Sequence, residues 1–344
     1  MKITMQHAEG CVMDILRAGL VANLISSPGI GKSALAKQIA EKQKLKLIDV
    51  RLSQMDPADL NGFPFIINKD TPENTRAGYV PMNIFPIASD PVPEGYEGWL
   101  VLMDEFPSAP LNVQAAAYKI VLDKMVGMHH LHSKVAIITA GNLSTDKAIV
   151  NRLSTAMQSR VVTLEIIVCD KAWGIWADKH DVDHRVKSFI KFKPALLHKF
   201  DPNHSEHTFP CPRTWEFMSK IIKPIKEIGI TRLPVLAGTV GEGTAREFHS
   251  YCMIFGDLPT LTDILRDPEN VHFGDEPSIH YALSGLVGHH INPTNVNDLV
   301  KFVKRLGIDF QVVTLRAAIA KNSDIRKASG IKNWIVHNAE EYLG

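Results

Sequence analysis

The stretch that decides the fold is Asn23-Leu24-Ile25-Ser26-Ser27-Pro28-Gly29-Ile30-Gly31-Lys32-Ser33, an apolar run that breaks into a Gly/Pro loop. The segment 21–25 is strand-like, and the segment 33–44 has Leu35 and Ile39 one helical turn apart. Glycines let a loop aim several N–H groups at one point, and a helix beginning there adds the positive end of its dipole. The pattern predicts a phosphate-binding loop between a strand and a helix.

The residues of this loop have expected roles. Lys32 is expected to reach the β- and γ-phosphates of a nucleotide, and the Ser33 hydroxyl to ligate Mg²⁺. Ser26 stands where the pattern G-x-x-x-x-G-K-[ST] has its first glycine, so the match is incomplete there. The alternative is a Gly/Pro turn before an ordinary helix. The predicted nucleotide-binding residues are Ser27, Pro28, Gly29, Ile30, Gly31, Lys32, Ser33 and Ala34.

A second landmark is Trp99-Leu100-Val101-Leu102-Met103-Asp104-Glu105, five apolar residues that run into two carboxylates. A continuously apolar strand is typical of a central parallel sheet, where chemistry gathers at the carboxyl ends of strands. We expect Asp104 to hold Mg²⁺, and Glu105 to orient and deprotonate the attacking water. The alternative, a buried strand ending in solvated acids, loses weight beside the phosphate loop upstream.

The run 135–140 predicts another buried strand, which ends at Gly141-Asn142. The Asn142 amide is a candidate to bind the γ-phosphate or the attacking water, although an Asn after a strand is also a common turn residue. Before this strand, His129-His130-Leu131-His132 brings three histidines together. No Cys or carboxylate accompanies them at ligand spacing, so a solvated loop is expected rather than a metal site.

Arg160 lies between a predicted helix over 146–159 and a predicted strand over 161–168. An arginine at such a joint can act as an arginine finger, which reaches the γ-phosphate on a neighbouring subunit and stabilises the transition state. Arg152 is the competing candidate, and a surface salt bridge is the alternative for either residue.

After residue 168 the strand signal disappears and helical spacing takes over. We therefore expect three parts: an α/β nucleotide-binding subdomain (1–168), a helical lid subdomain (169–225) and a mainly helical C-terminal extension (226–344). Arg213 falls in the first turn of a predicted helix and is placed to reach back to the nucleotide.

A local basic face is also predicted early in the helical part. It is most simply a solvated surface, with nucleic-acid binding as a minor alternative because aromatic residues are not regularly interleaved. The residues are Arg185, Lys187, Lys191, Lys193 and Lys199.

Composition limits the other function classes. With 38 Lys+Arg against 37 Asp+Glu, the formal net charge of +1 gives no overall attraction to nucleic acid or to anionic membrane. The four cysteines are far apart and form no C-x-x-C pair, which fits free thiols in a reducing compartment. No apolar run approaches the ~18 residues of a membrane span. We expect a globular cytoplasmic protein without a membrane partner.

Together these motifs resemble those of the MoxR family of AAA+ ATPases. The resemblance covers roughly residues 1–225 and depends on several motifs in the same order. The matching segments are the phosphate loop Pro28-Gly29-Ile30-Gly31-Lys32-Ser33, Pro57-Ala58-Asp59-Leu60-Asn61-Gly62, Asp104-Glu105-Phe106-Pro107-Ser108-Ala109-Pro110 with Gln114, the sensor 1 pair Gly141-Asn142, the finger Arg160, and the sensor 2 triplet Cys211-Pro212-Arg213.

The resemblance implies an α/β P-loop NTPase core of the AAA+ type, with a parallel sheet flanked by helices, a helical lid and a helical extension. It implies a homo-oligomeric ring, usually a hexamer, that hydrolyses ATP with Mg²⁺ between subunits. Hydrolysis would remodel or activate a protein client, often one with a von Willebrand factor A domain. Phe63 and Phe65 would lie on an insert facing the centre of the ring, or pack as core aromatics.

Two other functions stay open at this point. A DNA-directed motor or loader would use the basic face described above. A scaffold that binds ATP without hydrolysing it would use the nucleotide only to assemble.

Overall fold

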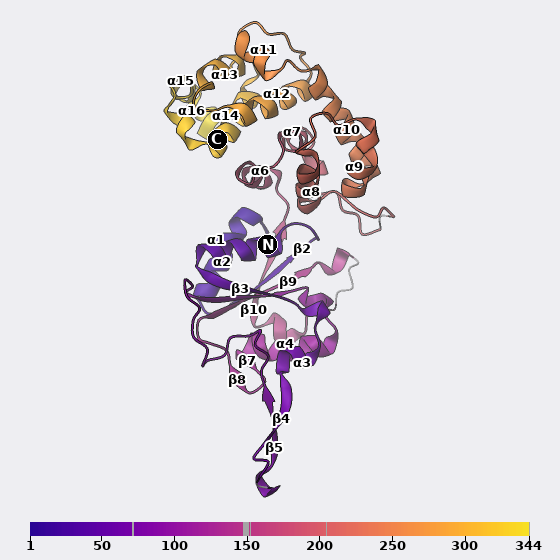
Figure 1. Ribbon diagram of the computed structural model, residues 1–344, viewed down its shortest axis with the longest axis vertical. Coiled ribbons are helices and arrows are strands. Elements are labelled where there is room, and N and C mark those ends of the chain that lie inside the picture. The colour runs from indigo at the N-terminus through magenta and orange to yellow at the C-terminus, as the bar shows by residue number, and fades with distance from the viewer. Residues whose placement is uncertain (71, 147–150, 152, 204, 344) are drawn as a thin grey trace. The chain divides into compact units, whose positions relative to one another are not determined.

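The computed structural model describes residues 1–70, 72–146, 151, 153–203 and 205–343 (Figure 1). The chain divides into two compact units, 1–167 and 168–344. Across the described part of both units, no helix has the length and apolar character needed to cross a membrane.

The first unit is built on a six-stranded sheet in which every neighbouring pair of strands is parallel. The strand order is β1-β10-β2-β9-β6-β3, so the strand before the phosphate loop, β2, is central. Because the strands are parallel, their carboxyl ends share one edge. The strands are β1 (Lys2–Thr4), β2 (Val21–Ser26), β3 (Leu45–Arg51), β6 (Gly98–Asp104), β9 (Val135–Asn142) and β10 (Val161–Ile167).

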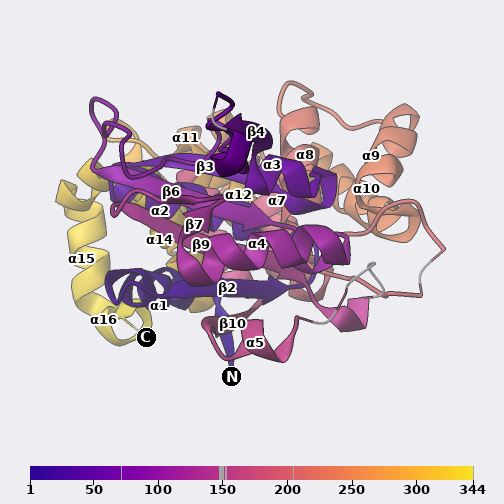
Figure 2. The same ribbon diagram turned by 90° about the horizontal axis from the view of Figure 1, so that it is seen from below.

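Helices cover both faces of this sheet, which explains why a central strand such as β6 is continuously apolar up to Asp104. On β6, Leu100 and Leu102 pack with the buried residues of α1 (Met5–Arg17) and α2 (Lys32–Lys42). The alternate residues of β6, Val101 and Met103, belong to the opposite layer. That layer includes α4 (Leu111–Asp123), seen in front of the sheet in Figure 2, and α5 (Thr155–Gln158).

The predicted fold class is therefore confirmed. The chain has an α/β core in which a parallel sheet is flanked by helices and the phosphate loop joins a strand to a helix, and it has a mainly helical C-terminal part.

An antiparallel hairpin lies between β3 and β6 in the chain. It pairs β4 (Phe63–Ile67) with β5 (Arg76–Val80), and Figure 1 shows it projecting from the rest of the first unit. The short helix α3 (Pro57–Asn61) precedes it and begins with a capping box between Asp56 and Asp59. A two-residue pair, β7 (Met125–Val126) and β8 (His129–His130), forms a second small ribbon.

The prediction of one helix over 146–159 is wrong for the described residues of that segment. Asn151 is not helical, because its backbone N–H donates to the carbonyl of Pro107 instead of entering a helix ladder. The helix α5 begins only after Ser154, whose hydroxyl accepts the N–H of Met157 as an N-cap. The segment 147–150 and Arg152 lie outside the described residues.

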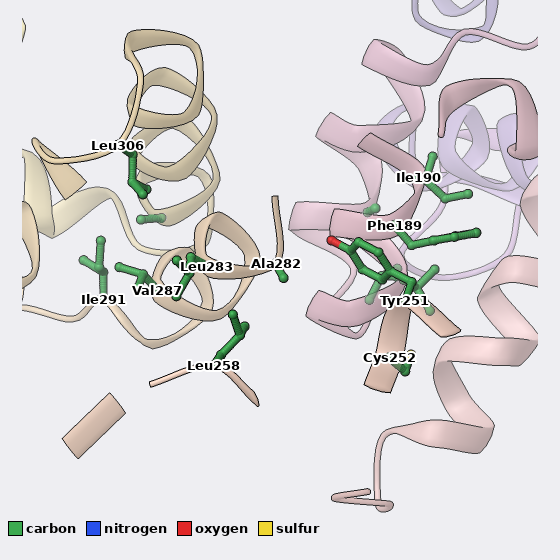
Figure 3. Packing of buried hydrophobic residues seen from close by; sticks show 14 of the residues in the cluster. Phe189, Ile190, Tyr251, Cys252, Leu258, Ala282, Leu283, Val287, Ile291 and Leu306 are labelled. Carbon is green, nitrogen blue, oxygen red and sulfur yellow. The ribbon is translucent and has the colours of Figure 1, made fainter. Parts of the chain in front are cut away.

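The second unit is helical and has one continuous apolar core from Trp173 to Trp334, which spans the predicted lid and the predicted extension. Figure 3 shows part of it, with the Tyr251 ring beside Phe189, 5.3 Å between centroids. The separation into lid and extension stays a prediction. The helices are α6 (Asp170–Lys179), α7 (His184–Phe192), α8 (Pro212–Ile222), α9 (Leu233–Val240), α10 (Glu242–Asp257), α11 (Leu261–Arg266), α12 (Pro277–His290), α13 (Val296–Val303), α14 (Ile308–Lys321), α15 (Ser329–His337) and α16 (Ala339–Leu343).

The predicted basic face is wrong as a single solvated surface. Arg185 is buried and forms an ion pair with the buried Asp183, and Lys187 is paired with Asp178 with both side chains about nine-tenths buried. These charges on α7 point into the packing of the second unit because each has a partner there. The continuous basic surface that a DNA-directed motor would need is therefore not formed at Arg185 and Lys187.

Candidate active site

The phosphate loop connects β2 to α2 at the carboxyl edge of the sheet. Gly29 has a φ of 77° and Gly31, the N-cap of α2, a φ of 114°, values that a residue with a side chain adopts at a cost. The first N–H groups of α2 have no partner within the helix, so they are available to an anion at this end. The sequence therefore produces the strand, loop and helix that phosphate binding requires.

The Lys32 side chain turns back over the loop and is only 8 % exposed. Its ammonium donates to the Ser26 hydroxyl at 2.9 Å, to the Ser26 carbonyl at 3.3 Å and to Asn142 Oδ1 at 3.0 Å. Ser26 and Asn142 are register partners on β2 and β9. The serine in place of the first glycine thus binds the lysine, and these three acceptors are uncharged oxygens.

Ser33, in the first turn of α2, contacts Asp104, the last residue of β6. The Ser33 hydroxyl donates to Asp104 Oδ2 at 2.7 Å. In an octahedral Mg²⁺ shell with bonds of about 2.1 Å, adjacent oxygen ligands are roughly 3 Å apart, so this pair fits two neighbouring positions. The remaining positions around a protein-bound Mg²⁺ are commonly filled by phosphate oxygens and water, so the residues fit this ion.

Glu105 directly follows β6 and has a left-handed backbone, with φ of 57°. Its N–H donates to Asp104 Oδ1 at 2.8 Å, and its carboxylate accepts a short hydrogen bond from the Ser53 hydroxyl. Ser53 lies on a 3-10 turn, Leu52–Gln54, that continues β3. The proposed base is therefore held at the edge from two sides.

The acids make this part of the edge electronegative. Burial raises the pKa of the Asp49 carboxyl, and the charges of Asp104 and Glu105 raise it further, while Arg51 opposes them. Asp49 and Arg51 are both on β3, and Arg51 is the register partner of Asp104. A cation placed between Ser33 and Asp104 would be attracted by all three carboxylates.

Arg160 lies at the amino ends of the strands, opposite the carboxyl ends where the phosphate loop lies. It immediately precedes β10, whose first residue pairs with Val21 at the start of β2, while the phosphate loop follows the end of β2. At about 3.3 Å per strand residue, the six residues of β2 separate the two edges by roughly 16 Å. Arg160 is exposed, and its guanidinium donates to the Ala156 carbonyl at 3.1 Å. Within one chain it is not part of the Lys32 site.

Arg213 is in the second unit, in the first turn of α8, and is exposed. Its contact with a nucleotide stays a prediction. Arg152, the competing finger, is outside the described residues.

Sequence reasoning missed Ser53 and Asp49 as part of this edge, and treated Ser26 only as a departure from the motif. The only signal in the sequence for these two residues is their place at the end of a predicted strand. Both missed residues are near the end of, or directly after, a strand that becomes the neighbour of β6. Strand neighbours cannot be deduced from one sequence, so the partner of Glu105 was not identified.

No family model matches this chain, and no curated protein matches it. Among solved structures, a point mutant of RuvB from Thermotoga maritima gives a TM-score of 0.41 at 13 % identity, covering 73 % of this chain and 71 % of that one. An ATPase candidate from Cytophaga hutchinsonii gives a TM-score of 0.35 at 11 % identity, covering 99 % and 90 %. Likenesses this low add nothing to what the residues and topology show.

Proposed function

We propose that this chain is a MoxR-like AAA+ ATPase that hydrolyses ATP and uses the energy to remodel or activate a protein client. The observation that supports this is a convergence: Lys32, Ser33, Asp104, Glu105 and Asn142 meet at the carboxyl edge of one parallel sheet. These groups are far apart in the sequence and match the parts that phosphoryl transfer requires.

The proposed reaction is ATP plus water to ADP plus phosphate. The water oxygen bonds to the γ-phosphorus, the bond to the bridging oxygen of ADP breaks, and Glu105 accepts the proton of the water. Lys32 exchanges its neutral oxygen partners for phosphate oxygens, which leaves the Asn142 amide available to the γ-phosphate or the water. Mg²⁺, held by Ser33 and Asp104, neutralises phosphate charge when bound.

The position of Arg160 supports assembly. An exposed arginine at the opposite edge of the sheet can serve a nucleotide only on another copy of the chain. We therefore infer a homo-oligomeric ring, hexameric as in the family that the sequence resembles, with ATP between subunits.

The hairpin is the part of the first unit best suited to contact a client. Five large apolar side chains on β4 and β5 are 43 to 61 % exposed. Phe63 and Phe65 are among them, so the alternative that these two pack as core aromatics is wrong. A client with a von Willebrand factor A domain is the first to test. The five are Phe63, Phe65, Ile66, Tyr79 and Val80.

The test is nucleotide binding by calorimetry and steady-state phosphate release for the wild type, Lys32→Ala and the control Lys37→Ala. Lys37 is on the same helix, exposed and paired with Glu41. We expect Lys32→Ala to abolish binding and release, because the charge that faces the phosphates is gone, and Lys37→Ala to match the wild type. A wild type that binds Mg-ATP without releasing phosphate would be a scaffold instead.

The ring is tested by mixing two inactive variants in the same assay. Arg160→Ala keeps its own phosphate site, and Lys32→Ala keeps its arginine, so a mixed interface contains one complete site. Recovery of phosphate release on mixing supports a shared site. Full activity of pure Arg160→Ala would show that this residue is not the finger.

A further inference from the structure

The turn that follows β6 determines where Glu105 lies. Glu105 has a φ of 57°, in the left-handed region that non-glycine residues rarely occupy, and such a conformation persists only where the surroundings fix it. Its carbonyl accepts the N–H of Ser108 at 2.9 Å, which closes the turn. The geometry of residues 106–109 is therefore part of the geometry of the proposed base.

Two amide side chains hold this turn from outside. The Gln114 amide nitrogen donates to the carbonyls of Ala109 at 3.0 Å and Pro107 at 3.4 Å. Asn151 serves the same two carbonyls, through its backbone N–H to Pro107 at 2.7 Å and its side-chain amide to Ala109 at 3.1 Å. Gln114 comes from α4 and Asn151 from the segment before α5, so the two fix the turn to separate parts of the unit.

The third side of the turn faces β9. A Cβ on Gly141 would come within 2.3 Å of the Pro107 ring, so the absence of a side chain there lets the turn pack directly beside Asn142. Moving the turn would therefore move Glu105 relative to the amide that Lys32 contacts.

Gln114 is 1 % exposed, and its Oε1 has no hydrogen-bond partner in the part of the chain that the structure describes. A buried acceptor without a partner is destabilising, so a glutamine at this position is explained by the bonds its nitrogen donates. An apolar residue of similar length would remove the unsatisfied oxygen together with those bonds.

We propose that Gln114 and Asn151 are positioning residues for Glu105. Together they hold the 106–109 turn and so fix the backbone of Glu105, whose N–H donates to Asp104 and whose carboxylate accepts from Ser53. The inference rests on the proposed ATPase function. It adds the residues that determine the position of the Glu105 carboxylate. Asn151 also ties the base to the segment that leads to Arg160.

The test is Gln114→Met in the full chain, with kcat, KM and the Kd of ATP measured. We expect kcat to fall about 10- to 100-fold, since small displacements of a catalytic group have effects of that size, and Kd to change by less than about 3-fold. A control in the second unit is Gln311→Met, which also removes the oxygen that accepts the Trp334 indole N–H at 2.6 Å. The Gln311 amide nitrogen likewise donates to two carbonyls, of Leu306 at 2.7 Å and Lys304 at 3.2 Å, and its loss should leave kcat unchanged.

A double variant separates positioning from general damage. In the Glu105→Gln background, Gln114→Met should lower kcat no further, because the residue through which it acts is already disabled. A further drop as large as in the wild-type background would overturn the proposal. If Gln114→Met does not fold, Asn151→Ala, which removes one side-chain bond among the described residues, must show the same split and the same non-additivity.

The outcomes distinguish the two proposals. A wild type that hydrolyses ATP, with Gln114→Met and Asn151→Ala fully active, would overturn the clamp and leave the ATPase function standing. A wild type without hydrolysis would overturn both.

Discussion

Lys32 in the first unit and Arg185 in the second unit donate to different kinds of acceptor. At the edge of the first unit, the Lys32 ammonium donates to a hydroxyl, a carbonyl and an amide oxygen, none of them charged. In the second unit, the Arg185 guanidinium is bidentate to Asp183, and its remaining bonds go to carbonyls near the end of α8. Phosphate oxygens can replace the neutral acceptors of Lys32, whereas the buried Arg185–Asp183 ion pair is part of the structure of the second unit.

This contrast gives the two sets of charges different consequences. Changes at the sheet edge should affect turnover and leave the fold alone. Changes at the buried pairs of the second unit should affect the free energy of unfolding and leave turnover alone.

The largest effect is expected for Glu105→Gln. The substitution keeps the shape of the side chain but removes the proton acceptor, so kcat should fall by about a thousandfold while ATP still binds and the melting temperature is unchanged. Single-turnover phosphate release measures the loss, with Glu41→Gln, an exposed acid on α2, as control. Wild-type turnover by Glu105→Gln would remove the base from the proposal.

Arg185→Met is the corresponding test in the second unit. It leaves Asp183 charged and buried without its main partner, so the free energy of unfolding should fall by about 3–5 kcal/mol. Urea unfolding followed by tryptophan fluorescence reports mainly this unit, because four of the five tryptophans are in it.

The control for this variant is Arg246→Met, which breaks an exposed i,i+4 pair with Glu242 and should cost about 0.5 kcal/mol or less. ATP turnover well below the unfolding transition should be equal in the wild type and both variants. A selective loss of turnover in Arg185→Met would contradict the division between the units.

A smaller loss in the free energy of unfolding is expected at acid pH. It comes from three histidines of the second unit. The ring of His184 is 5.3 Å from that of His289 and 6.4 Å from that of His290, centroid to centroid. Burial lowers the pKa of His184 to about 3, against the opposite effect of Asp183. Burial and the charge of Lys321 lower the pKa of His289 to about 4, and burial likewise lowers that of His290.

These groups titrate lower in the folded than in the unfolded chain, where the pKa is about 6.5. The unfolded state therefore takes up protons first, and stability present above pH 6.5 is lost as the pH falls towards 4. His184 alone should contribute a loss of about 2 kcal/mol between pH 7 and pH 5. Urea unfolding at the two pH values measures it. His289→Asn should flatten the dependence.

The parts that the sequence predicted well are those with local signals. The strand before the loop and the apolar strand ending in Asp104 each carry their pattern within a few residues, and each is confirmed. The roles of the site residues remain predictions, but their neighbourhood was anticipated because parallel strands bring their carboxyl ends together.

The errors have a common cause, which is partners distant in sequence. Arg185 has the sequence context of a surface cation, and only the folded chain encloses it between Asp183 and the end of α8. The hairpin was missed because Phe63 to Ile67 have no alternation, since their side chains are exposed rather than half-buried. Asn151 lies in a segment with helical spacing, but its N–H binds Pro107 instead.

The smallest effect is expected at Ser53, which the sequence did not identify. Its hydroxyl holds one carboxylate oxygen of Glu105, while the backbone of Glu105 is fixed independently by Asp104 and the turn. Ser53→Ala should therefore lower kcat by only about 3- to 10-fold, through a less well oriented base, with ATP affinity unchanged. Ser53→Thr keeps the hydroxyl and should recover the rate. If alanine and threonine behaved alike, the hydrogen bond would have no part in turnover, and the orientation of Glu105 would depend on the clamped turn alone.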